Sequence, residues 1–182
     1  MGQNIYGVDI GTSNFKMCCK DKDKIINEKN IIAIANKKDI LAFGDEAYEM
    51  YEKAPEHIEV SFPVKFGVIA DIENMQTLLL RFFNKMNDDK KFTGNTDFYI
   101  AVPTDVTEVE KRAFYELVAD SKVKAKNIYI VDKPVADAIG AGLDVTKSKG
   151  IMIVNIGAET TEISVLSLAL LSANLLKSAV TS

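Results

Sequence analysis

The chain has few of the residues that cross-link small proteins or bind metals. Its 182 residues include no tryptophan, a single histidine (His57) and two cysteines, Cys18 and Cys19. The cysteines are adjacent in a predicted strand, where neighbouring side chains point to opposite faces, and this geometry opposes a disulfide. With one histidine and no other cysteine, neither a zinc site nor a thiol-protease site can be assembled. We interpret both cysteines as small strand residues.

Long apolar runs and excess positive charge are also missing. No stretch reaches the roughly 18 apolar residues of a membrane helix, and the N-terminus has neither the charged nor the apolar region of a signal peptide. The formal net charge is −4, with lysines and acidic residues interspersed, which argues against nucleic acid as a partner. The length suits one cored domain, and we expect a cytoplasmic protein.

The most informative stretch is Gly7–Lys16, G-V-D-I-G-T-S-N-F-K. It predicts a short apolar strand, a turn and a second strand. Asp9 contributes a carboxylate, Gly11 lacks a hindering side chain, and small polar residues follow, so the backbone amides of the turn can face an anion. An ordinary hairpin with a polar turn fits this stretch equally well. A second copy, I-V-N-I-G-A-E-T-T-E-I at Ile153–Ile163, favours a pair of phosphate-binding turns.

The rest of the chain predicts a mixed α/β sheet, because a meander of short strands precedes two strand–helix units. The expected strands are Ile5–Ile10, Phe15–Lys20, Ile25–Ile26, Ile31–Ile34, Ile40–Phe43, Phe98–Val102, Asn127–Val131 and Gly150–Ile156. Short helices are expected at Asp45–Tyr51 and Val135–Ala141, and Val68–Ala70 is interpreted as a return to the main body.

Two longer helices are predicted from apolar spacing and capping. In the first, apolar residues recur at intervals of three and four: Met75, Leu78, Leu79, Phe82, Phe83 and Met86. The second opens with a capping box formed by Thr107 and Glu110. Its expected buried side carries Val109, Ala113, Leu117 and Val118.

Four motifs in order carry a resemblance to a known family. They are G-V-D-I-G-T-S-N at Gly7–Asn14, P-V-K-F-G-V-I-A-D at Pro63–Asp71, V-P-T-D-V-T-E-V-E-K-R-A at Val102–Ala113 and K-P-V-A-D-A-I-G-A-G-L at Lys133–Leu143. From Ile5 to Leu168 the chain resembles the N-terminal half of the MreB family. These rod shape-determining bacterial actins are cell-shape ATPases that share a fold with actin and the heat-shock-70 ATPase domain. The first motif is common to the actin superfamily, whereas the other three favour MreB over chaperones, sugar kinases and plasmid-segregating actins.

The resemblance implies an actin-like (ribonuclease H-like) α/β fold, a mixed sheet with flanking helices and a small inserted α+β subdomain. Residues 1–32 and 71–149 would form subdomain IA. Residues 33–70 would form the inserted subdomain IB, which makes filament contacts, and residues 150–182 would begin domain II.

The resemblance also implies a site for ATP and Mg²⁺ between two phosphate loops. The nucleotide-binding positions would be Gly11, Thr12, Ser13, Asn14, Gly157, Ala158 and Glu159. Asp9 would hold Mg²⁺ through water, which suits an ion that keeps most of its own waters. We expect binding in this chain to be weak or incomplete.

Several positions depart from the family pattern. Lys133 stands where the family motif E-P-M-A-A-A-I-G carries an acidic residue that orients the attacking water, and a charged lysine cannot accept a proton from water. It can instead pair with a phosphate oxygen or with Asp132. In the second loop, the family's D-I-G-G-G-T-T-E has become N-I-G-A-E-T-T-E, so Asn155 replaces an acidic residue and Ala158 and Glu159 replace glycines. Since no catalytic residue is retained, we predict weak or absent ATPase activity.

The end of the chain is a further departure, because the family sequence continues through the whole of domain II. We therefore expect a truncated, N-terminal half. The stretch Ala169–Ser182 has no family counterpart. It fits either a frameshifted gene or an apolar C-terminal helix with Leu168, Leu171, Leu175 and Leu176 as its stripe.

Three functions remain open. The leading one is an MreB-like cytoskeletal protein that self-associates into filaments and takes part in cell shape determination. The alternatives are a non-catalytic filament-interaction module and an active actin-like or chaperone-like ATPase. The cell-shape machinery and the inner membrane surface are candidate partners. Lys85, Lys90 and Lys91 near the loop Asp88–Thr96 favour an anionic surface, although a solvated loop explains them as well.

Overall fold

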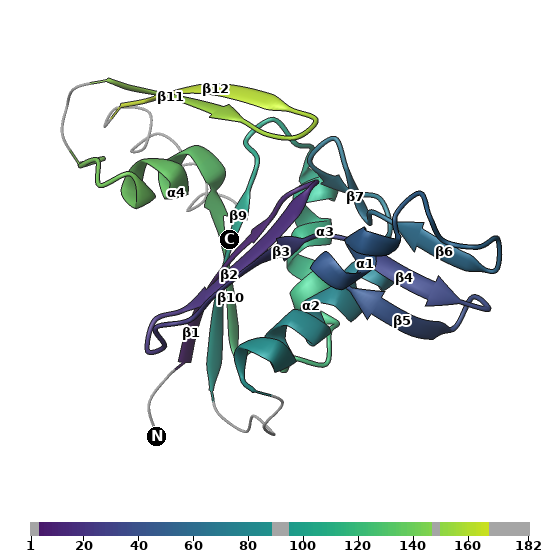
Figure 1. Cartoon of the computed structure of the whole chain (residues 1–182). Coiled ribbons are helices and arrows are strands. Elements are labelled where there is room, and N and C mark those ends of the chain that lie inside the picture. Colours follow the sequence, from purple (N-terminus) through teal and green to yellow (C-terminus); the bar gives the residue numbers. More distant parts are fainter. Residues whose placement is uncertain (1–3, 89–94, 147–149, 168–182) are drawn as a thin grey trace.

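The computed structural model describes residues 4–88, 95–146 and 150–167. Figure 1 shows a central sheet, a small sheet with α1 on one side of it, and a separate hairpin beyond α4. The strands are β1 (Asn4–Ile10), β2 (Asn14–Cys19), β3 (Ile25–Lys29), β4 (Ile32–Ala35), β5 (Asp39–Phe43), β6 (Ile58–Ser61), β7 (Val64–Lys65), β8 (Val68–Ile69), β9 (Thr96–Val102), β10 (Asn127–Asp132), β11 (Ile151–Ile156) and β12 (Thr161–Leu166). The helices are α1 (Asp45–Met50), α2 (Ile72–Met86), α3 (Glu108–Ala119) and α4 (Lys133–Gly140).

The central sheet has five strands in the order β10-β9-β1-β2-β3. β1 pairs in parallel with β9, and β9 in parallel with β10, whereas β2 and β3 continue from β1 as an antiparallel meander. The predicted mixed sheet is confirmed. Because β1, β9 and β10 are parallel, their carboxyl ends meet at one edge of the sheet, where polar residues follow each strand.

The main core lies between this sheet and α2 and α3. Tyr6, Val8 and Ile10 alternate along β1 and are buried on the face toward the helices. All six residues of the predicted apolar stripe on α2 are buried. Phe15 of β2 stacks on Phe82 of α2 with ring centroids 4.5 Å apart, which joins the meander to the helix.

Helix α3 confirms one prediction and corrects another. The Thr107 side chain accepts a hydrogen bond from the Glu110 amide, and the Glu110 carboxylate accepts one from the Thr107 amide, which completes the capping box. Val109, however, is 79% exposed, and Phe114 is buried with Leu117 and Val118. Val109 lies nine residues before Val118 and is therefore turned about 180° from it around the helix.

The small sheet has the order β5-β4-β6 and carries α1. Its own core contains Ile31, Ala33 and Ala47. β6 was not predicted, although its four residues, I-E-V-S between Pro55 and Pro63, alternate between apolar and polar as a strand does. The small sheet falls within the range expected for the inserted subdomain, although the division into subdomains stays a prediction. Val64 of β7 already belongs to the main core.

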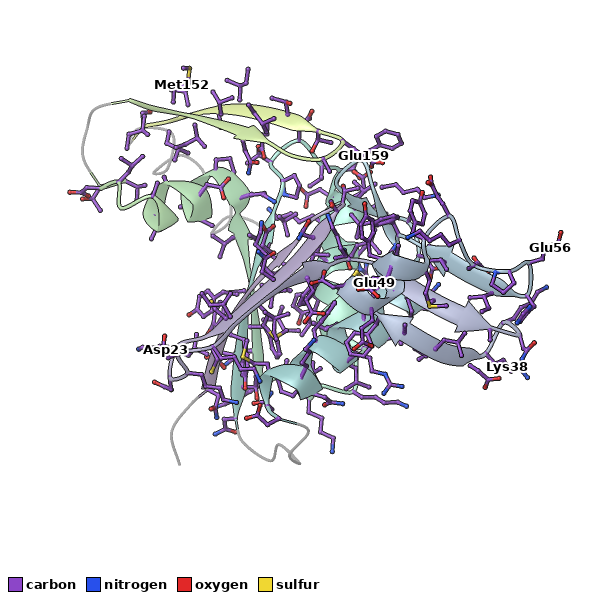
Figure 2. The ribbon with its side chains drawn as sticks, viewed as in Figure 1. Asp23, Lys38, Glu49, Glu56, Met152 and Glu159 are labelled. Atoms are coloured by element: carbon purple, nitrogen blue, oxygen red, sulfur yellow. The ribbon has the colours of Figure 1, made fainter. Side chains whose placement is uncertain are left out.

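The β11–β12 hairpin contacts α4 through one face. Its outer face is apolar and exposed: Met152, Val154, Ile156, Ile163 and Val165. Figure 2 shows Met152 directed away from α4. The cysteines lie as predicted, with Cys18 exposed and Cys19 buried.

Some predictions fall beyond the described residues, among them the C-terminal helix and the positions of Lys90 and Lys91. Lys85 is described, and its ammonium pairs with Glu28 Oε1 at 2.5 Å. The positive charge of Lys85, which was a candidate contact for an anionic surface, is therefore already paired with a carboxylate of the protein. In the described part of the chain, none of the helices combines the length and apolarity needed to cross a membrane.

The two faces of α3 allow a stability test. We expect Leu117→Ala to lower the free energy of unfolding by about 2–5 kcal/mol, because it leaves a cavity in the main core. Val109→Ala on the same helix should change it by less than about 0.5 kcal/mol, because this side chain is solvated. Urea denaturation followed by circular dichroism measures both. Equal losses from the two variants would contradict the burial pattern.

Candidate functional site

Two turns of the same form face one cleft. The residues Gly11–Asn14 join β1 to β2, and Gly157–Thr160 join β11 to β12. The Gly11 amide donates to Asn14 O at 3.0 Å, and the Gly157 amide donates to Thr160 O at 2.8 Å. A Cβ atom would lie 2.9 Å from Asn14 O at Gly11 and 3.0 Å from Thr160 O at Gly157. Both turns therefore require glycine at the first position, and the predicted second copy of the hairpin is confirmed.

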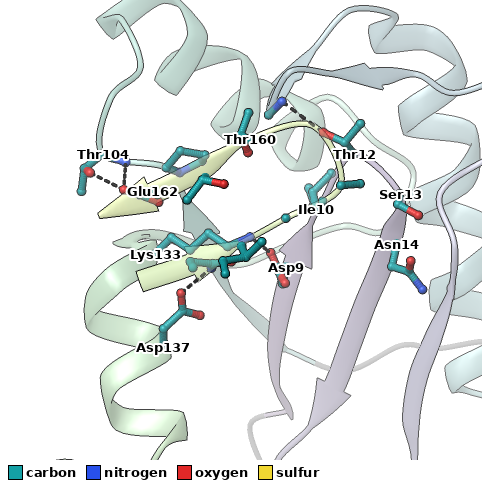
Figure 3. Close-up of a pocket in the computed structure, with 18 of the residues that line it drawn as sticks. Asp9, Ile10, Thr12, Ser13, Asn14, Thr104, Lys133, Asp137, Thr160 and Glu162 are labelled. Carbon is teal, nitrogen blue, oxygen red and sulfur yellow. Dashed lines mark hydrogen bonds and ion pairs between the residues drawn. The ribbon is translucent and has the colours of Figure 1, made fainter. Parts of the chain in front are cut away.

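The cleft between the turns has a volume of about 1200 Å³. Figure 3 shows Thr12 and Ser13 on one wall, Thr160 and Glu162 on the opposite wall, and α4 below. Six of the seven predicted nucleotide-binding residues line the cleft: Gly11, Thr12, Ser13, Asn14, Gly157 and Ala158. Glu159 is not among the lining residues. Its carboxylate accepts a hydrogen bond from the Phe66 amide at 2.7 Å, so its charge is directed at the β7–β8 turn.

Both turns present free backbone donors. The amides of Thr12, Ser13 and Ala158 donate to no acceptor within residues 4–88, 95–146 and 150–167. Asn30 holds the first turn in place, because its side-chain amide donates to Gly11 O at 2.8 Å and its backbone amide to Ser13 O at 2.9 Å. Successive free amides in a turn form a concave site for an anion. The sequence reasoning missed Asn30, because its two contacts depend on how the end of β3 packs against the first turn.

Asp9 is at the end of β1 and is held by two lysines. Lys133 Nζ donates to Asp9 Oδ1 at 2.7 Å, and Lys16 Nζ donates to Asp9 Oδ2 at 2.9 Å. Burial alone would raise the pKa of Asp9, but the charge and hydrogen bond of Lys133, followed by those of Lys16, hold the pKa below its usual value. Asp9 is therefore a carboxylate at neutral pH.

These two contacts refine the sequence interpretation. Lys133 was expected to pair with a phosphate oxygen or with Asp132, and its carboxylate partner is instead Asp9, because the first residue of α4 faces the end of β1. The role of Lys16 was missed. Its signal was the hairpin register, which places Lys16 directly opposite Asp9.

The residues at this point do not fit the implied magnesium ion. Both carboxylate oxygens of Asp9 accept from lysine ammoniums, whereas Mg²⁺ requires carboxylate oxygens that are free to bind it or its waters. In the described ranges, three or more His, Cys, Asp or Glu side chains never gather in a way that could hold a metal ion. A dication beside two ammoniums would also be repelled.

Helix α4 connects the two turns. Lys133 reaches Asp9 on the first hairpin, and Asp137, one turn further along the same helix face, accepts a hydrogen bond from Asn155 Nδ2 of β11 at 2.6 Å. Residues four apart lie on one side of a helix, so α4 bridges both walls of the cleft. Figure 3 shows both contacts.

A further contact closes the far end of the cleft. Glu162 of β12 accepts hydrogen bonds from the backbone amide of Thr104 and from its hydroxyl, which ties the second hairpin to the segment after β9. Three of the four carboxylates that line the cleft thus accept bonds from protein groups, namely Asp9, Asp137 and Glu162. The fourth, Asp105, is in the segment between β9 and α3.

Comparison with known proteins agrees with this geometry. The family model described as MreB/Mbl protein matches residues 3–177. The cell shape-determining protein Mbl of Bacillus subtilis is 37% identical over 89% of this chain and 48% of its own length. The cell shape-determining protein MreB of Escherichia coli is 32% identical over 92% of this chain and 49% of its own length.

Solved structures show the same fold. MreB5 of Spiroplasma citri bound to AMPPNP superposes with a TM-score of 0.82 and 29% identity, covering 92% of this chain and 50% of MreB5. Its ADP-bound form gives a TM-score of 0.80 and 30% identity, covering 91% of this chain and 49% of MreB5. The actin-like fold expected from the motifs is therefore confirmed. The chain spans about half the length of these relatives, and it belongs to the MreB/Mbl family of actin-like, cell shape-determining proteins.

Proposed function

We propose that this chain is part of an MreB-type cytoskeletal protein that binds an adenine nucleotide in the cleft between the two glycine turns and self-associates into filaments. The observation that carries the proposal is the matched pair of turns facing one cleft of about 1200 Å³. Two structures of MreB5 of Spiroplasma citri, which share 30% and 29% identity with this chain and are bound to ADP and to AMPPNP, support the proposal.

Backbone amides would hold the phosphates. The amides of Thr12, Ser13 and Ala158 have no acceptor in the described part of the chain and line the cleft. The Thr12 hydroxyl accepts from the Gly67 amide at 3.1 Å, and the Ser13 hydroxyl accepts from Lys29 Nζ at 3.1 Å. Both hydroxyl hydrogens therefore remain available to donate to phosphate oxygens.

The same cleft is poorly equipped for hydrolysis. Lys133 occupies the position at which the family motif has its water-orienting acidic residue, and its ammonium has no lone pair for a water proton. Asp137 and Glu162 already accept hydrogen bonds from Asn155 and Thr104. We therefore propose binding with very slow turnover or none.

Filament formation and cell-shape function are proposed from family membership. The small sheet β5-β4-β6 extends from the main body, and Figure 2 shows Lys38 and Glu56 at its outer end. A surface that projects in this way suits contact between copies. The inner membrane surface and the cell-shape machinery are proposed partners of the whole protein, which we place in the cytoplasm.

Nucleotide binding is tested at the first turn. We expect Gly11→Ala to weaken binding of ADP or AMPPNP at least about tenfold, because the new Cβ atom would force the turn and its amides out of position. Gly140→Ala is the matched control, since a Cβ atom there meets no atom within 4 Å. Isothermal titration calorimetry measures both affinities. Equal affinities in the two variants would contradict the role of the turn.

Hydrolysis is tested by phosphate release. With ATP in excess, we expect the chain to release phosphate no faster than a buffer control, because its cleft lacks the water-orienting carboxylate. Steady turnover that disappears in Asp105→Asn would contradict this, because it would identify Asp105 as the missing base.

Self-association is tested by sedimentation at high protein concentration. We expect pelleting that increases when AMPPNP is present, because an ordered ligand between the two turns fixes the walls of the cleft relative to each other. Pelleting that is unaffected by nucleotide would favour the non-catalytic interaction module. No pelleting at any concentration would contradict self-association of this chain.

A further inference from the structure

The Asp9 cluster is a charge arrangement that the proposed function alone does not require. One carboxylate lies within 2.9 Å of two ammoniums, those of Lys16 and Lys133. One negative and two positive charges leave a net charge of +1 at the end of β1. The side chain of Lys133 is 18% exposed and that of Asp9 24%, so water screens this pair only partly.

Resting on the nucleotide site proposed above, we infer that the chain binds its nucleotide without a divalent cation. In this inference Lys133, assisted by Lys16, provides the positive charge that faces the phosphates. The ligand class is thus a metal-free nucleoside diphosphate or triphosphate, held by backbone amides on one side and by lysine ammoniums on the other.

Lys133 has the capacity for this second contact. An ammonium group has three N–H donors, and Asp9 accepts the one hydrogen bond recorded for Lys133 in the described ranges. Two donors remain for phosphate oxygens. The bond to Asp9 also fixes the position of a long flexible side chain, which reduces the entropy lost when a ligand binds.

The location of Lys133 suits this role. It lines the same cleft as Thr12, Ser13 and Ala158, whose amides are free to donate. It is the first residue of α4, and the hydrogen bond between Asp137 and Asn155 holds that helix against the second hairpin. The ammonium is therefore fixed to both walls between which the phosphates would lie.

In the described part of the chain, the acidic groups closest to Lys133 already have protein partners. Asp9 accepts from two lysines, Asp137 Oδ2 accepts from Asn155, and Glu159 is turned to the Phe66 amide outside the cleft. A magnesium ion would have to displace an ammonium from Asp9 and remain beside it. Lysine, a compact point charge, is a common phosphate ligand in its own right.

The decisive experiment compares affinities with and without metal. AMPPNP is titrated calorimetrically into the chain in excess Mg²⁺ and, separately, in excess EDTA. We expect the two dissociation constants to differ by less than about threefold, because the protein itself supplies the positive charge. We also expect Mn²⁺, followed by its electron paramagnetic resonance signal, to show no binding to the nucleotide-free chain.

A matched pair of lysine variants tests the assignment. In EDTA, Lys133→Gln should weaken AMPPNP binding by about tenfold or more, since a charge-assisted contact is lost. Lys24→Gln is the control, because Lys24 also forms a close ion pair, with Asp88 at 2.6 Å. Asp23, the neighbour of Lys24 in the chain, lies far from Glu159 in Figure 2, and the Lys24→Gln substitution should leave the affinity unchanged.

The possible failures are distinguishable. Affinity that falls at least about tenfold in EDTA, or Mn²⁺ binding to the free chain, would overturn the inference and leave the nucleotide site intact. Absence of binding in both buffers would remove the proposed nucleotide site and the inference with it. Equal affinities for Lys133→Gln and Lys24→Gln in EDTA would overturn the role of Lys133.

Discussion

Both carboxylate oxygens of Asp9 are paired with lysines, and the way they are paired determines how the site is assembled. Its two partners come from different parts of the chain: Lys16 is opposite it in the hairpin, and Lys133 is 124 residues away at the start of α4. The Lys133 contact fixes α4 against the first turn, and Asp137 on the same helix fixes Asn155 of the second hairpin. One ion pair therefore connects, through one helix, both walls of the cleft.

The substitutions relative to the family motifs are consistent with this pairing. Lys133 in place of an acidic residue raises the side-chain charge by two, Asn155 in place of an acidic residue raises it by one, and Glu159 in place of a glycine lowers it by one. Because the Glu159 carboxylate is directed at the Phe66 amide outside the cleft, only the changes at Lys133 and Asn155 act inside it. Considered separately, these changes look like losses of function, whereas together they make the cleft more positive toward an anion.

Local patterns in the sequence predicted most of the fold. The glycine turns, the apolar stripe of α2 and the capping box of α3 follow from residues close together in the chain, and all three are confirmed. Val109 was placed wrongly because apolar type alone does not decide which side of a helix faces the core. The partner of Lys133 was not predictable in this way, because a contact across 124 residues depends on how α4 packs against β9 and β10. The direction of the Glu159 side chain could not be predicted for the same reason, because its carboxylate accepts a hydrogen bond from the Phe66 amide, which is distant in the sequence.

Binding and hydrolysis would depend on different parts of this site, and the departures from the family pattern fall in both: Lys133 stands at the water-orienting position, and Ala158 and Glu159 stand in the second turn. The free amides depend on the two turns, in which a Cβ atom at Gly11 or Gly157 would lie 3.0 Å or less from a backbone oxygen. Hydrolysis requires a specific carboxylate beside the attacking water. Under the proposed function, the cleft would keep its ligand without cleaving it, since both glycines are present and the acidic position holds Lys133. The nucleotide would then act as a structural element between two walls rather than as a substrate.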